Sequence, residues 1–553
     1  MTRSGGQLLV DQLVLHGAEL AFSVPGESYL PVLDALHDAP VRLVVTRHEG
    51  GAANMAEAYG KLTGRPGICL VTRGPGATHA SNGLHTASQD STPMILLVGQ
   101  VRRDAIGREG FQELDLRAVF GSMAKWVETI ADPARIPELV ARAYAVATSG
   151  RPGPVVLGLP EDMLGDTADV PDAAPHRPPA AARPDPDAMA RLAELLATAE
   201  RPLAIVGEGG WTAQTGAFIA AFAEAQRIPV AASWRCQDYV HNDSPAYAGH
   251  AALGMDPALA ARIREADVLL AIGGRLSEIT TDGYTLIRPP APAQRLVHVH
   301  PDPNELGAVY GPDLGIACGL EAFARAAAAL APAGADRRAG LLDAARADYE
   351  RNLSEVVDLP GDLQMSAVMA ALRERLGPEA IICSGAGNFT IWAHRYYEFR
   401  RYPSQLAPRS GSMGYGLPAA IAAKAVHPER PVVCIAGDGD FLMTGQELAT
   451  AVQEELAVVV LLVNNGMYGT IRMHQERRYP GRVVGTDLRN PDFAALARAF
   501  GAHGALVERS EDVGSALDEA LTCGGPALLE LRVDPQAITP RGTLDALRAA
   551  AAT

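Results

Sequence analysis

The chain has 553 residues, of which 48% are hydrophobic and 20% charged, and its formal net charge is -16. This length predicts about two to four domains with separate cores, and the composition excludes a disordered chain. The negative charge argues against nonspecific binding of nucleic acid or of an anionic membrane surface.

Residues 1–165 open with an amphipathic helical pattern that carries no signal-peptide core. Short β-rich runs then alternate with helical patterns, which is typical of a parallel sheet with helical crossovers. The runs begin at Val41, Gly67, Met94 and Gly153. Pro, Ala and Asp dominate residues 166–188, so an extended linker is expected there.

A second alternation covers residues 189–335 and predicts a central Rossmann-like domain. Residues 336–362 form a connector, residues 363–540 repeat the alternation a third time, and residues 541–553 are an Ala-rich tail. The predicted fold class is therefore α/β, with three doubly wound parallel-sheet domains. The longest strongly apolar run, 457–463, is too short to cross a bilayer, and six cysteines without a CxxC pair suit a cytoplasmic protein.

The strongest chemical signal is Gly437-Asp438-Gly439, which directly follows a strand of the third domain. The next strand ends at Asn464-Asn465, and parallel strands present their carboxyl ends on one sheet edge. Asp438 and Asn465 are therefore expected to meet there, where hard oxygen ligands suit magnesium. The glycines let backbone amides approach a diphosphate, and a helix near Thr444 would add its positive end. A loose turn followed by a strand terminator is the alternative reading.

This pair of motifs resembles the diphosphate and metal site of thiamine diphosphate enzymes. The resemblance implies that Asp438, Asn465 and the main-chain oxygen of Met467 hold Mg²⁺. Residues 47–100 resemble the pyrimidine-binding domain of the acetolactate synthase catalytic subunit nearly end to end. By that resemblance Glu49, where a strand meets a helix, is the catalytic acid/base that bonds the pyrimidine nitrogen. A glutamate that merely stabilises the helix dipole is the alternative.

Gly411-Ser412-Met413-Gly414 resembles the family segment that bends the cofactor. Met413 would lie under the bend and the carbonyl of Gly411 would receive the cofactor amino group, unless Met413 is an ordinary core residue. Phe111 and Gln112 match pocket positions, and Gln112 is expected to contact substrate. The remaining cofactor-binding positions that the resemblance implies are Pro25, Gly26, Gly387, Asn388, Gly437, Gly439 and Asp440. Asp440 is unusual beside an anionic diphosphate, so its side chain is expected either to point away or to accept from a donor that the sequence does not identify.

The substrate pocket is expected to include Glu27, Ser91, His474 and Gln475. Glu27 replaces a small residue, and His474 stands where biosynthetic acetolactate synthases carry a tryptophan that favours 2-oxobutyrate. A solvated helix face is the alternative for His474 and Gln475. The predicted reaction is decarboxylation of a small 2-oxo acid, pyruvate first, with carboligation to a second carbonyl. A non-ligating decarboxylase, a flavin-dependent oxidase, a carboligase with another acceptor and a silent binding homologue stay open.

The family resemblance also bears on assembly and on a second cofactor. It implies a homodimer with active sites shared between subunits, or a tetramer. Glycine turns follow two strands of the central domain, at residues 207–210 and 273–275. In acetolactate synthases and pyruvate oxidases this domain holds FAD, but the family's acidic pattern after the second turn is missing, so FAD stays open.

Overall fold

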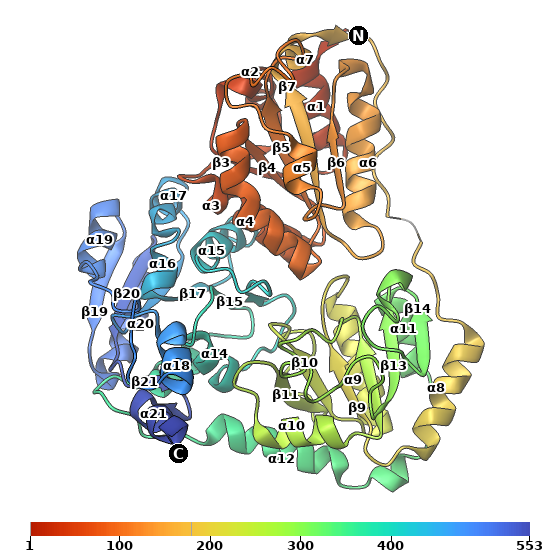
Figure 1. The fold of residues 1–553 in the computed structure, drawn as a ribbon, viewed down its shortest axis with the longest axis vertical. Coiled ribbons are helices and arrows are strands. Elements are labelled where there is room, and N and C mark those ends of the chain that lie inside the picture. Colours follow the sequence, from red (N-terminus) through yellow and green to blue (C-terminus); the bar gives the residue numbers. More distant parts are fainter. Residues whose placement is uncertain (1, 179, 553) are drawn as a thin grey trace.

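The computed structural model describes residues 2–178 and 180–552, so residue 179 of the predicted linker and residue 553 of the predicted tail lie outside the described residues. Three six-stranded sheets, each parallel throughout, form three α/β layers. In Figure 1 the N-terminal layer lies at the top, the central layer at the lower right and the C-terminal layer at the lower left. The predicted fold class is confirmed.

The N-terminal sheet has the strand order β3-β2-β4-β5-β7-β6. Alternate side chains of its buried strands face opposite cores, one under α3 and α4 and the other under α1 and α6, because successive residues of a strand point to opposite faces. The bounds of its elements are β1 (Arg3–Ser4), α1 (Gly5–Leu15), β2 (Leu20–Ser23), α2 (Leu30–His37), β3 (Arg42–Val45), α3 (Glu49–Thr63), β4 (Gly67–Val71), α4 (Gly74–Asp90), β5 (Met94–Gln100), α5 (Leu116–Phe120), β6 (Trp126–Thr129), α6 (Ile136–Thr148), β7 (Pro154–Pro160), α7 (Glu161–Gly165) and β8 (Thr167–Ala168).

The central sheet has the order β11-β10-β9-β12-β13-β14. No helix or strand is assigned between β8 and α8 among the described residues of the predicted linker, and α8 begins inside its last three positions. The bounds are α8 (Pro186–Thr198), β9 (Leu203–Val206), α9 (Ala213–Gln226), β10 (Val230–Ser233), β11 (Tyr247–Ala251), α10 (Pro257–Glu265), β12 (Val268–Ile272), β13 (Arg295–His300), β14 (Leu314–Ala317), α11 (Leu320–Ala328) and α12 (Leu341–Ser354), the last within the predicted connector.

The C-terminal sheet has the order β16-β15-β17-β18-β20-β19. Its final helix, α21, falls within the predicted tail and packs against α18. The bounds are α13 (Met365–Arg375), β15 (Ile381–Ser384), α14 (Thr390–Tyr396), β16 (Gln405–Leu406), α15 (Gly416–Val426), β17 (Val432–Gly437), α16 (Asp438–Phe441), α17 (Leu448–Gln453), β18 (Val459–Asn464), α18 (Gly469–Arg478), α19 (Phe493–Phe500), β19 (His503–Val507), α20 (Val513–Thr522), β20 (Ala527–Arg532), β21 (Ala537–Thr539), β22 (Gly542–Thr543) and α21 (Leu544–Ala552).

The N-terminal and C-terminal layers share one continuous core, because α3 packs directly against α15. A buried polar cluster joins them at this contact. The Tyr415 hydroxyl donates to Glu57, and Lys61 forms ion pairs with Glu57 and Asp90. Among residues 2–178 and 180–552, no helix is both long and apolar enough to cross a membrane.

Candidate active site

The structure brings Asp438 and Asn465 together at the carboxyl edge of the C-terminal sheet. β17 and β18 pair in parallel with Gly437 opposite Val463, so both residues leave the sheet at the same edge. Together they line a cavity of about 320 Å³. Other predicted residues that line it are Gly387, Asn388, Gly411, Met413, Gly437, Gly439, Asp440 and Met467.

Asp438 is buried, and backbone amides hold its carboxylate in place. One oxygen accepts from the amide of Gly439 at 2.9 Å, and the other accepts from the amide of Gly466 at 2.9 Å and from Asn490 Nδ2 at 2.7 Å. Burial raises the pKa of Asp438, and these three donors partly oppose that rise. Asn490 could not be identified from the sequence, because it lies in a loop after the motif and has no fixed spacing from it.

Asp440 has the donors that its position requires. Its Oδ1 accepts from the amides of Ala386 and Gly414, each at 2.9 Å, so the carboxylate joins two segments of the cavity wall. Burial raises the pKa of Asp440 to about 6, although these hydrogen bonds and Arg235 oppose the shift. Asp440 therefore both lines the cavity and holds two segments of the cavity wall together.

The loop that carries Met413 is fixed at both ends, and we call residues 407–414 the Met413 loop. At its start, the amide of Arg409 donates to Asp90 Oδ1 at 2.8 Å, and Arg235 donates to the carbonyl of Pro408. At its end, Thr444 Oγ1 donates to the carbonyl of Gly414 at 2.6 Å, in addition to the Asp440 contact. Arg235 is a buried cation beside the cavity that no sequence motif revealed.

The glycines of the Gly437-Asp438-Gly439 motif have close aromatic neighbours. A Cβ at Gly437 would lie 2.7 Å from the Phe389 ring, and one at Gly439 would lie 2.4 Å from the Tyr468 ring. Both glycines are therefore required by packing even before a ligand is considered. The chain then continues in short helical pieces, so α16 starts at Asp438 itself and no long helix begins near the predicted Thr444.

Asn388 links two walls of the cavity. Its backbone amide donates to Thr470 Oγ1 at 3.0 Å, and that hydroxyl donates to Asn388 Oδ1 at 3.0 Å. The Asn388 side chain also donates to the carbonyl of Ile538 at 3.2 Å. These contacts set the start of α18 against β21, next to the main chain of Met467.

Glu49 lies at the first position of α3 and is not among the residues that line this cavity. Its Oε2 is 2.8 Å from His79 Nδ1, and the His79 ring stacks on that of His48 with a centroid separation of 4.6 Å. The buried carboxylate of Glu447 accepts from the amide of Arg47 at 3.1 Å, which fixes the entry to α3. Sequence reasoning identified neither His79 nor Glu447, because each lies on a separate element from Glu49.

The other predicted residues of the N-terminal domain lie on several of its surfaces. Glu27 is exposed and pairs with Arg73 at 2.8 Å, beside exposed Pro25 and half-buried Gly26. Phe111 is 76% exposed. The backbone carbonyl of Gln112 accepts from the amide of Gly74 at 2.9 Å, and its side chain lines a separate hollow of about 1060 Å³.

None of the four predicted substrate-pocket residues, Glu27 included, is among the residues that line the cavity. Ser91 is buried where the N-terminal and central domains meet, and it accepts from Arg151 Nε at 3.0 Å. His474 is exposed on α18. Gln475 donates to the carbonyl of Val484 at 2.8 Å and so holds the loop that follows α18.

Comparison with known proteins matches each layer separately. Residues 3–119 match the thiamine pyrophosphate enzyme N-terminal TPP binding domain, residues 189–327 match the central domain, and residues 385–531 match the C-terminal TPP binding domain. The acetolactate synthase large subunit of Parasynechococcus marenigrum is 34% identical over 96% of this chain and 88% of its own length. The acetolactate synthase isozyme 2 large subunit of Escherichia coli is 32% identical over 96% of both chains.

The three layers in this order, with the cavity at the edge of the third sheet, define a thiamine diphosphate-dependent enzyme. The similarity to the two relatives runs through all three domains without a large gap in coverage. The chain belongs to the thiamine pyrophosphate enzyme family, alongside the acetolactate synthase large subunits. The predicted family and the predicted use of thiamine diphosphate are confirmed.

Proposed function

We propose that this enzyme decarboxylates pyruvate and joins the remaining two-carbon unit to a second 2-oxo acid, as an acetolactate synthase does. The observation that carries the proposal is the meeting of Asp438, Asn465 and Met467 in a cavity that Met413 also lines. When bound, thiamine diphosphate supplies the carbon nucleophile and the electron sink for this chemistry. The two acetolactate synthase large subunits named above are similar to this chain over 96% of its length.

The donor set at the cavity fits a magnesium ion. A carboxylate offers about four lone-pair positions, and Asp438 uses three of them for the amide and Asn490 donors. Within residues 2–178 and 180–552, the one hydrogen bond to Asn465 Oδ1 comes from the amide of Met467 at 3.2 Å, which leaves this oxygen able to bind a cation. We assign Asp438, Asn465 and the carbonyl of Met467 as the protein ligands of Mg²⁺.

We assign Glu49 as the acid/base, with His79 holding its orientation. The 2.8 Å contact occupies one carboxylate oxygen of Glu49 and leaves the other for a proton shared with the pyrimidine nitrogen. Met413 would support the cofactor from below, and the carbonyl of Gly411 would accept its amino group. Phe111 and Gln112 remain proposed contacts of the substrate.

Assembly is part of the same proposal. The cavity is lined by residues of the central and C-terminal domains, and no N-terminal residue is among those described as lining it. A site that needs both Glu49 and Asp438 can be completed by a second copy whose N-terminal domain covers this cavity. The exposed Phe111 ring is an apolar surface suited to such a contact. We therefore propose a cytoplasmic homodimer, or a tetramer of such dimers, with shared active sites.

The choice of acceptor rests on His474 of α18 and on Glu27 of the N-terminal domain. Exposed His474, together with Glu27 paired to Arg73, favours a second substrate other than 2-oxobutyrate. A non-ligating decarboxylase or a carboligase with another acceptor would share the cofactor site, so product analysis must separate them.

The test supplies purified protein with thiamine diphosphate, Mg²⁺ and pyruvate, and follows carbon dioxide and acetolactate together. Acetolactate formed at one molecule per carbon dioxide supports the proposal. Free acetaldehyde would show instead that the enzyme is a non-ligating decarboxylase. Acetate together with hydrogen peroxide would show that it is an oxidase. If pyruvate is inert while the cofactor binds, the substrate assignment is wrong.

A further inference from the structure

Two glycine turns of the central domain meet where a doubly wound sheet normally receives a dinucleotide. β9 leads to residues 207–210 and β12 leads to residues 273–275, and these strands are neighbours in the sheet. In a dinucleotide site, backbone amides and a helix N-terminus at this edge bind the diphosphate. The family resemblance leaves FAD binding at this edge open. The contacts of the two turns therefore decide whether the domain can hold this cofactor.

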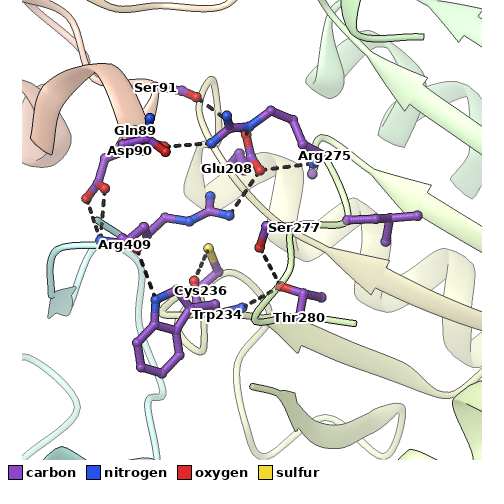
Figure 2. Close-up of polar contacts among 12 residues, drawn as sticks. Gln89, Asp90, Ser91, Glu208, Trp234, Cys236, Arg275, Ser277, Thr280 and Arg409 are labelled. Carbon is purple, nitrogen blue, oxygen red and sulfur yellow. Dashed lines mark hydrogen bonds and ion pairs between the residues drawn. The ribbon is translucent and has the colours of Figure 1, made fainter. Parts of the chain in front are cut away.

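A buried carboxylate of this chain takes the donors that a diphosphate would need. Glu208 Oε1 accepts from the backbone amide of Arg275 at 2.9 Å, and Oε2 accepts from Arg275 Nε at 2.6 Å. Arg409, from the Met413 loop, donates to Oε1 at 3.0 Å. Figure 2 shows both guanidinium groups converging on this one carboxylate. Two guanidinium groups and an amide are the donor set of an anion site.

The backbone conformation and the charge of Glu208 both indicate that its carboxylate is a permanently placed anion. Its φ is +61°, a conformation that glycine adopts freely and that costs a glutamate about 1 kcal/mol or more. Burial alone would raise the pKa of this carboxyl, but Arg409 and Arg275 together lower the pKa to about 2. The side chain is therefore ionised at neutral pH, and its contacts hold the backbone in a strained conformation.

The N-terminal domain covers the same turn. A Cβ at Gly209 would lie 2.6 Å from the carbonyl oxygen of Ser91, so the backbones are in direct contact. Arg275 Nη2 donates to the carbonyl of Gln89 at 2.7 Å, as Figure 2 shows. An adjoining cavity of about 390 Å³ is also lined by Arg275 and Arg409, but their charge is already paired with Glu208.

We infer that the central domain does not accept a flavin dinucleotide, because Glu208 occupies the position of its diphosphate as an internal anion. The carboxylate joins all three domains, through Arg275 of the central domain, Arg409 of the C-terminal domain and the Ser91 turn of the N-terminal domain. This inference does not depend on the proposed acetolactate chemistry. It does remove the cofactor that a flavin-dependent oxidase would need.

The first test titrates FAD into the full-length protein loaded with thiamine diphosphate and Mg²⁺, and follows flavin fluorescence and the melting temperature. We expect no quenching and no rise in Tm, whereas loading the apoprotein with thiamine diphosphate and Mg²⁺ raises Tm and serves as the positive control. Protein purified from riboflavin-fed cells and then denatured should release no flavin. Stoichiometric flavin in either measurement would overturn the inference.

The second test asks whether Glu208 is the cause. Glu208→Gly removes the carboxylate and relieves the strained φ, so this variant should bind FAD at least about tenfold more tightly than the wild type. Glu278→Gly is the matched control, because Glu278 is exposed and lines the adjoining cavity without contacting either arginine. It should gain no affinity.

A folded Glu208→Gly protein that still does not bind FAD would disprove the role assigned to this carboxylate. If that variant does not fold, Glu208→Gln keeps the side-chain shape without the charge. It should lower Tm, because it leaves Arg409 buried without a counter-charge, and it should still gain FAD affinity. Unchanged affinity in folded Glu208→Gln would then count against the inference.

Discussion

Asp438 and Asp440 are two residues apart, yet their carboxylates have different partners. Asp438 is held by the amides of Gly439 and Gly466 and by Asn490, and it keeps a free position toward the cavity. Asp440 accepts from Ala386 and Gly414, which belong to two separate segments of the wall. The Asp438 carboxylate is therefore suited to bind a ligand, whereas the Asp440 carboxylate shapes the cavity that receives the ligand.

Asp440 provides a direct test of this difference. Asp440→Ala leaves the two buried amides without an acceptor, which costs about 1–3 kcal/mol for each amide. Asp440→Asn keeps one carbonyl oxygen in the same place and should lose far less stability. Urea unfolding measures both variants, and titration calorimetry with thiamine diphosphate should show weakened binding for the alanine variant alone. Equal losses in the two variants would contradict the assigned contacts.

His250 predicts a pH effect on stability. It is buried in the central domain, and burial lowers its pKa from 6.5 to about 4. Between those two pH values His250 is protonated in the unfolded chain but stays neutral in the folded chain. The free energy of unfolding therefore falls as pH drops from 6.5 to 4. His250→Leu should remove up to about 3 kcal/mol of that decline. Chemical unfolding across this range measures it, with exposed His241→Leu expected to follow the wild type.

At the scale of elements, α21 supports α18. Arg548 Nε donates to Glu476 Oε2 of α18 at 2.8 Å, and Leu544 packs in one cluster with Met467 and Met473. The end of the chain, predicted as a tail, therefore braces the helix that follows the proposed metal ligands. Its short Ala-rich sequence has little periodic signal, so its docking depends on contacts that only the folded chain creates.

Removing α21 should consequently weaken cofactor binding. A chain ending at Thr543 exposes Met467 and Met473 and leaves Glu476 without Arg548, so Mg²⁺-dependent binding of thiamine diphosphate should weaken roughly tenfold or more. Calorimetry at several Mg²⁺ concentrations measures this. Asp545→Ala, which removes only an exposed partner of Arg548, is the control and should bind normally. Unchanged affinity in the truncated chain would mean that α21 has no bracing role.

The sequence predicted most buried strands, because a parallel strand covered on both faces is a continuous apolar run. It also predicted that Asp438 and Asn465 would meet, since parallel strands share an edge. It missed β6, whose four residues include Glu128 and Thr129, because this edge strand lacks such a run. It also missed the contact of Glu208 with Arg409, which lie 201 positions apart, since polar pairs across domains leave no periodic trace.

For the whole molecule, the decisive arrangement is the separation of Glu49 from the cavity that contains Asp438. The N-terminal and C-terminal layers share a core through α3 and α15, whose ribbons lie side by side in Figure 1, and Glu49 is not among the residues that line the cavity. A second copy resolves this geometry. In the proposed dimer, the N-terminal domain of one copy would bring its Glu49 to the cavity of the other.

Mixing two inactive variants tests the shared site. Glu49→Gln should keep cofactor binding and lose about 10²–10⁴ in turnover, and Asp438→Ala should lose the metal. After the two proteins are dissociated and reassociated together, mixed dimers contain one site with both changes and one intact site. Random mixing then restores about a quarter of wild-type activity. No recovery, with mixed dimers shown by mass spectrometry, would place each site within one chain.

The fixed ends of the Met413 loop have a thermodynamic consequence. Ordering a free backbone costs about 1–2 kcal/mol for each residue, and a ligand that orders a loop must supply that energy from its own contacts. Here Asp90 accepts a hydrogen bond from the start of the loop, and Asp440 accepts one from its end. Because the chain's own contacts order this loop, thiamine diphosphate would lose little of its contact energy to ordering it.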